Sequence, residues 1–158
     1  MLSETILISQ FELARNFTLQ LAKDITEENA DLMPKGFKNS LRWQLGHIYT
    51  SVEGLLFHFA NESVTLPDGY GELFNTGTKP ADWKGNPPQI EELVPLLVEQ
   101  LNRVKETFTG RSSEKLSKPV ELGQMKFETI GELLSFVSLH ESEHQGRIKS
   151  LKDGIQAA

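Results

Sequence analysis

The chain contains no cysteine. Disulfides, thiolate metal ligands and a catalytic thiol of the protein's own are therefore excluded. The chain also lacks any apolar run near the roughly 18 residues that a membrane-crossing helix needs. Its N-terminal segment has neither the basic start nor the cleavage-like end of a targeting peptide. We therefore expect a cytoplasmic protein with no membrane-embedded part.

Positive charge is scarce as well. The 16 lysines and arginines are outnumbered by 22 aspartates and glutamates, which leaves a net charge of -6. An acidic surface repels phosphate backbones, so nucleic acid is not an expected partner. The 158 residues, of which 38% are hydrophobic, are enough to bury a substantial core. We expect one domain over residues 1–158.

Hydrophobic residues recur with helical spacing in four segments. The expected helices cover residues 3–24, 39–61, 86–109 and 129–153. Asn39 or Ser40 is a suitable cap for the second helix, and Thr129 with Glu132 forms a capping box for the fourth. Pro95 predicts a late start or a kink in the third helix, and Gly154 predicts the end of the fourth. The fold class is therefore all-α, a four-helix bundle.

Two connections between these helices carry information. The connection over residues 62–87 is longer than a simple turn between helices requires. Its aromatic residues Tyr70, Phe74 and Trp83 favour a packed lid, with a short helix at "YGELF". The stretch "LSKPVELGQMKFET" alternates apolar and polar residues around Gly123, which predicts a small hairpin.

The expected fourth helix carries the run "HESEH", with His140 and His144 on its apolar stripe. Residues four apart lie about 40° apart around a helix and can chelate one ion. His47 and His58, on the second helix, are separated by about 16 Å along the axis, so only one can join the pair. We favour His47, although helices of either relative direction fit the pattern.

The alternative to a metal site is a histidine that is merely hydrogen-bonded in the core, and we prefer that interpretation for His58. It is less attractive for the pair, because burying two imidazoles without partners is costly. A zinc protease also has the H-E-x-x-H pattern, but only 14 residues follow His144 and none of them is histidine or glutamate. The third ligand must therefore lie upstream.

A site of three neutral imidazoles with an open position suits one divalent transition metal, zinc or nickel. Such an ion lowers the pKa of a bound water or thiol. Glu141 follows a ligand directly and is a candidate to orient or deprotonate that species. The other interpretation of Glu141 is a solvated helix acid.

The stretches "LRWQLGHIYTSVEGLL" and "LLSFVSLHESEHQGRI" resemble the DinB-like superfamily over essentially the whole chain. The family's metal triad falls on His47, His140 and His144, which strengthens the choice of His47. Where the family often has H-x-G-Q after the last ligand, this chain has Arg147 in place of the glutamine. The resemblance implies an up-down-down-up bundle, frequently a homodimer.

Relatives in that family include transferases and isomerases that use a low-molecular-weight thiol such as bacillithiol. The resemblance therefore implies a metal-dependent thiol S-transferase acting on small electrophiles, for which the thiol would be a co-substrate. Trp43, Tyr70, Phe74 and Trp83 are candidate substrate-binding aromatics. The alternatives are a hydrolase, with a metal-bound water and Glu141 as its base, and a non-enzymatic metal-stabilised bundle in a stress response.

Overall fold

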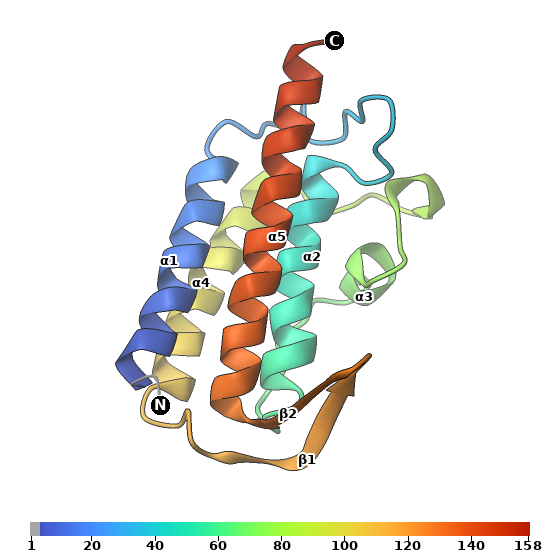
Figure 1. Ribbon diagram of the computed structural model, residues 1–158. Coiled ribbons are helices and arrows are strands. Elements are labelled where there is room, and N and C mark those ends of the chain that lie inside the picture. The colour runs from blue at the N-terminus through green and yellow to red at the C-terminus, as the bar shows by residue number, and fades with distance from the viewer. Residues whose placement is uncertain (1–3) are drawn as a thin grey trace.

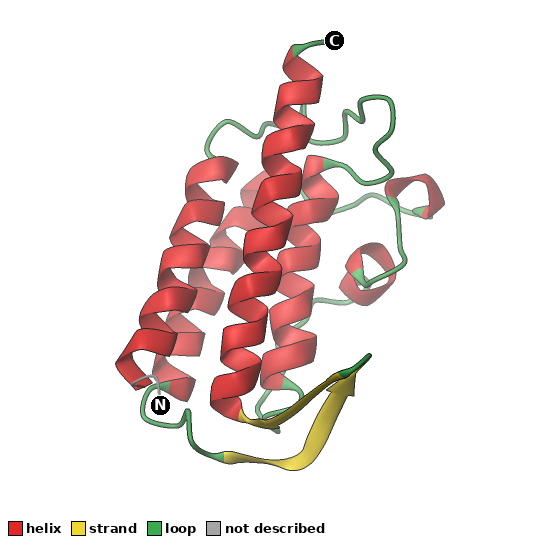
Figure 2. Ribbon diagram, viewed as in Figure 1, coloured by secondary structure: helices red, strands yellow, loops and turns green. Residues whose placement is uncertain are grey.

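A computed structural model describes residues 4–158 and is mostly helical. Four long helices lie side by side, a short helix and a 3-10 turn stand to one side of them, and a hairpin crosses one end (Figures 1 and 2). The elements in chain order are α1 Glu4–Ala22, α2 Leu41–Val52, a π-helical turn η1 Glu53–Phe57, α3 Tyr70–Phe74, η2 Pro80–Asp82, α4 Ile90–Phe108, β1 Lys115–Leu122, β2 Met125–Thr129 and α5 Ile130–Gln156.

The expected starts of α2 and α5, which rest on capping residues in the sequence, are confirmed. Ser40 caps α2 by accepting a hydrogen bond from the backbone N–H of Trp43. Thr129 and Glu132 form both hydrogen bonds of the capping box at the start of α5. These caps fix the height at which α2 and α5, the two histidine-bearing helices, begin.

The expected helix ends are less accurate. The first helix ends at Ala22 rather than residue 24, and its expected start at Ser3 lies outside the described residues. The second stops being α-helical at Val52, and η1 ends it at Phe57 rather than residue 61. α4 begins at Ile90 rather than residue 86 and runs on through Pro95.

α5 runs through Gly154 instead of stopping there. A Cβ atom at this glycine would lie 2.9 Å from Pro34, which belongs to the loop between α1 and α2. The missing side chain makes room for that loop. Gly154 does not end the helix, which continues to Gln156.

The expected hairpin is present. β1 and β2 pair antiparallel around Gly123, whose φ of 61° suits glycine in the turn. Val120 and Phe127 of the hairpin are buried in a core cluster with residues of α1, α4 and α5. The chain thus combines its helices with a small sheet, which an all-α fold class does not include.

The long helices pack in a ring of neighbours, since α1 contacts α4 and α5, and α2 contacts the same two helices. A second core cluster, at the opposite end from the hairpin, joins α2, α3, α4 and α5. In the described part of the chain no helix combines the length and apolarity that a membrane span requires. Between the two clusters α2 and α5 bring their histidines together.

Candidate metal centre

The three histidines chosen from the sequence meet at one point. His47 comes from α2, and His140 and His144 come from α5. Nε2 of His140 lies 3.3 Å from Nε2 of His47 and 3.2 Å from Nε2 of His144. All three ligand atoms lie within 4.8 Å of one another, and within residues 4–158 they form the group that could hold a metal ion.

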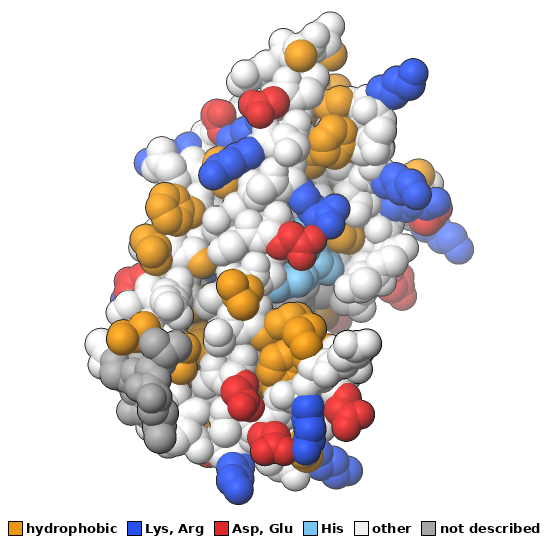
Figure 3. All heavy atoms as spheres, viewed as in Figure 1, with side chains coloured by type: hydrophobic (Ala, Val, Ile, Leu, Met, Phe, Trp, Pro, Cys, Tyr) orange, Lys and Arg blue, Asp and Glu red, His pale blue; other side chains and the backbone are white. Residues whose placement is uncertain are grey.

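These separations fit a metal ion. A tetrahedral zinc ion with bonds of about 2.0–2.1 Å holds two imidazole nitrogens about 3.3 Å apart. His47 and His144 are buried and His140 is half-buried, so the site opens on one side only. Figure 3 shows histidine surface in a hollow between α5 and α2, with acidic and basic side chains beside it. This opening leaves room for a further ligand from solution.

Hydrogen bonds on the far side of two rings set their tautomers. Nδ1–H of His47 donates to the backbone carbonyl of Phe74 at 2.6 Å, and Nδ1–H of His144 donates to Oε1 of Gln44 at 2.6 Å. Because both acceptors are oxygens without a hydrogen to give, each Nδ1 must carry the proton. Each Nε2 then presents a lone pair to the common point, as a metal ligand must.

Electrostatics keeps the rings neutral. Burial lowers the pKa of His47 to about 4 and that of His144 to about 3, and it also lowers the pKa of His140. Neutral imidazoles are the form that binds a metal, so at pH 7 no proton needs to be displaced from these rings. The three neutral imidazoles can therefore bind a metal cation without first losing a proton.

The sequence around His47 explains its fixed orientation. Its ring stacks on Trp43, one turn earlier, with centroids 4.5 Å apart and planes inclined by 11°. A Cβ atom at Gly46, the residue before His47, would lie 2.5 Å from the ring of Phe74. Only glycine therefore lets the last turn of α3 approach α2 closely enough for the Phe74 carbonyl to reach His47.

Glu141 does not point at this site. Its carboxylate accepts hydrogen bonds from Nε and Nη2 of Arg15, at 2.8 and 3.0 Å, and from Oγ1 of Thr18 at 2.7 Å. The side chains of Glu141 and Arg15 are almost fully buried, with 1% and 0% exposure. Gln100 of α4 accepts from the same guanidinium. Glu141 thus binds α5 to α1, and this geometry does not support its expected role as a base.

The four candidate aromatics form a layer beside the metal centre. Trp43 stacks on His47, and its indole N–H donates to Thr78 in the 62–87 connection. Tyr70 and Phe74 are buried against one another, and Trp83 packs edge-on against Phe74. The expected short helix at "YGELF" is α3.

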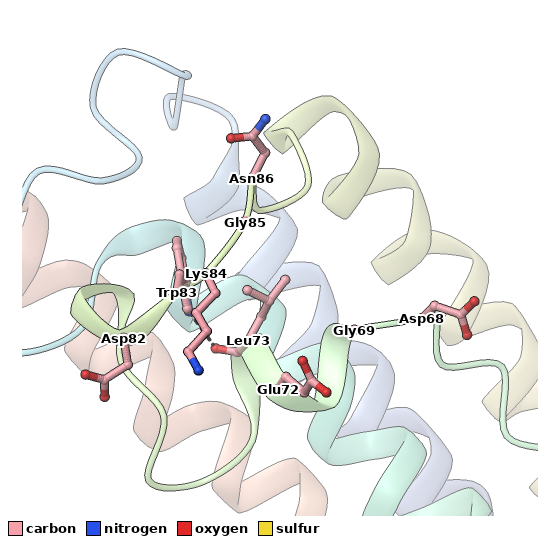
Figure 4. A pocket seen from close by; sticks show the side chains of 9 residues that line it. All are labelled: Asp68, Gly69, Glu72, Leu73, Asp82, Trp83, Lys84, Gly85 and Asn86. Carbon is pink, nitrogen blue, oxygen red and sulfur yellow. Dashed lines mark hydrogen bonds between the residues drawn. The ribbon is translucent and has the colours of Figure 1, made fainter.

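Of these four aromatics, only Trp83 lines a cavity of about 580 Å³, which is formed by residues of the 62–87 connection. Figure 4 shows that Asp68, Glu72 and Asp82 line it too, together with Lys84. None of the three histidines lines this cavity. The connection therefore packs against α2 and supports His47 through Phe74, and its own cavity is separate from the metal centre.

The remaining histidine lies elsewhere. His58 is exposed just after η1, where its ring packs edge-on against Phe59, so the interpretation as a core residue was wrong. Gln44 was missed by the sequence reasoning, although its position three residues before His47 puts it on the same face of α2. No sequence signal points to the Phe74 carbonyl, because a backbone atom has no residue-type signature.

Fold and site together define a class: a mostly helical protein in which three histidines from two helices could hold one metal ion. The family model described as DinB superfamily matches residues 10–148, which include all three histidines. The chain belongs to the DinB superfamily. No curated protein matches it.

Proposed function

We propose that the protein binds one divalent transition metal, zinc or nickel, on His47, His140 and His144 and acts as a thiol S-transferase toward small electrophiles. The main support for the metal site is that three Nε2 atoms converge on one point, and that hydrogen bonds at Nδ1 orient two of the three rings. Membership of the DinB superfamily supports the same function.

When bound there, a divalent transition metal favours the anionic form of a thiol. The nucleophile must come with a co-substrate, because the chain has no cysteine. The reaction forms a bond between the thiol sulfur and the electrophile and breaks the bond to the leaving group, and the thiol proton passes to that group or to solvent. The Phe74 carbonyl holds His47, and Gln44 holds His144, in the tautomer that leaves Nε2 free to bind a metal.

The bundle order and the assembly are part of the proposal. In Figure 1 the colours run upward along α1 and α5 and downward along α2 and α4, which supports the up-down-down-up order. A homodimer formed through α1 is supported by Ile6, Leu13 and Phe17, which are 42%, 57% and 56% exposed on that helix. An apolar stripe of this kind is the type of surface that protein partners cover.

The hydrolase alternative loses its specific support, since the carboxylate of Glu141 is held by Arg15 and Thr18. A metal-stabilised bundle without catalysis remains the alternative to test. It predicts that metal raises the unfolding temperature of the protein. It also predicts that the metal-loaded protein does not speed the reaction of thiols with electrophiles beyond the uncatalysed rate.

The test begins with metal content, measured by mass spectrometry on untagged protein. Wild type is expected to hold close to one equivalent after reconstitution, and His47→Ala and His140→Ala are expected to lose it. His58→Ala is the matched control, because this histidine is exposed and outside the site. Metal retained in His47→Ala, or absent from wild type, would contradict the three-histidine site. Loaded wild type is then assayed for conjugation of small thiols to a chromogenic aryl halide.

A further inference from the structure

A second hollow lies next to the metal centre, at the end of the bundle where α2 begins. It is a cavity of about 350 Å³, called here the basic pocket, and it is lined by Gly36, Phe37, Lys38, Asn39, Gln44 and Arg147. Two of these residues are cations and none is an acid, in a chain whose net charge is -6. The lining thus opposes the overall charge of the protein.

The basic pocket and the metal centre share a wall. Gln44 lines the pocket and also accepts the hydrogen bond from Nδ1 of His144. Arg147 follows His144 by three residues on α5, about 4.5 Å further along the helix axis. Burial is the main cause of the lowered pKa of all three histidines, and the positive charge of Arg147 adds to it, which places the guanidinium within electrostatic reach of the centre.

The hydrogen-bonding groups of the pocket are available to a ligand. Arg147 is 58% exposed and its partner is Glu143, four residues earlier, at 2.7 Å. An exposed pair at this spacing is worth only about 0.3–0.5 kcal/mol, so a ligand can replace Glu143 with little loss. Lys38, the other cation of the pocket, is exposed as well.

We propose that the basic pocket is the subsite for a carboxylate of the thiol co-substrate, held by Arg147 and Lys38 while the sulfur occupies the open side of the metal centre. The inference rests on the proposed function and narrows its substrate class to small anionic thiols. A guanidinium and a carboxylate form paired, charge-assisted hydrogen bonds, which are stronger than neutral ones. Neutral thiols lack this contact.

The experiment uses the full-length protein loaded with Co²⁺, in which thiolate binding produces a charge-transfer absorption. Mercaptosuccinate is titrated as the anionic probe and 2-mercaptoethanol as the neutral one, in low salt because exposed charges are screened at high ionic strength. The measured quantity is the ratio of the two dissociation constants. Using a ratio removes any change that a substitution makes to the metal itself.

In Arg147→Gln the preference for mercaptosuccinate is expected to fall about tenfold relative to wild type, as for loss of a charge-assisted hydrogen bond. Lys38→Gln is expected to show a smaller decrease in the preference for mercaptosuccinate. Glu143→Gln removes the competing acid and is expected to raise the preference. Lys149→Gln is the control, because this exposed lysine lies on α5 but does not line the pocket. The same ratio in all four variants and wild type would overturn the inference.

Failure of the proposed function gives a different result. If Co²⁺ does not bind, or if neither thiol produces the absorption, the thiol chemistry itself fails. The anion site is then judged by calorimetric titration of succinate into wild type and Arg147→Gln. Equal heats in both would overturn the subsite as well.

Discussion

The substitution Gly46→Ala tests whether the metal centre depends on the close approach of α3. The new methyl group would lie 2.5 Å from three atoms of the Phe74 ring, which has no exposed surface. Forcing an extra methyl into a packed site costs about 1–3 kcal/mol. If α3 shifts to make room for the methyl, the Phe74 carbonyl also moves away from Nδ1 of His47, and loss of such a contact lowers metal affinity about 10–100-fold.

Two measurements follow from this reasoning: urea unfolding of the metal-free protein, and zinc affinity by competition with a chromophoric chelator. Gly54→Ala is the matched control in η1, where a Cβ atom would meet nothing within 4 Å. It is expected to leave the affinity unchanged. The double variant Gly46→Ala with Phe74→Leu makes room for the methyl and is expected to recover part of both losses. Stability and affinity of Gly46→Ala equal to wild type would refute the packing argument.

Three further predictions concern the buried polar groups. Gln44→Ala removes the acceptor for His144, and zinc affinity in the same chelator assay is expected to fall about 10–100-fold. Arg15→Met leaves Glu141 buried and unpaired and is expected to cost about 3–5 kcal/mol in urea unfolding, most of which Arg15→Met with Glu141→Leu should restore. Burial lowers the pKa of His47 to about 4 and of His144 to about 3, so the unfolded chain binds more protons below pH 6.5. The unfolding free energy of the metal-free protein should therefore fall by a few kcal/mol between pH 6.5 and pH 4, and a flat profile would contradict the burial of these rings.

Most of the histidine cluster could be predicted from local rules, and the resemblance to a known family strengthened the choice of His47. His140 and His144 lie one turn apart on an apolar stripe, and the distance between His47 and His58 along one helix excludes a site that uses both. The starts of α2 and α5 were equally predictable, since Ser40 and Thr129 act on residues three positions away. Each of these signals is contained within a few turns of one helix.

The partner of Glu141 could not be predicted, because a helical wheel gives the direction of a side chain but not the neighbour found there. The residue lies about 100° around α5 from His140, and the wheel counts both as near the buried stripe. α5 packs against both α1 and α2, so that rotation carries the side chain from one neighbour to the other. The partner of Glu141 is Arg15, 126 residues away, and no local pattern links them.

The two polar faces of α5 constrain each other. His140 and His144 face α2, while Glu141 and Gln145 face α1, where Gln145 donates to the carbonyl of Ala14. Any rotation of α5 that moved the histidines away from His47 would also take the Glu141 carboxylate from Arg15 and leave a buried charge unpaired. Losing one partner of a buried ion pair costs more than most single contacts contribute. The ion pair, which lies outside the metal centre, therefore fixes the rotation at which α5 presents its histidines to α2.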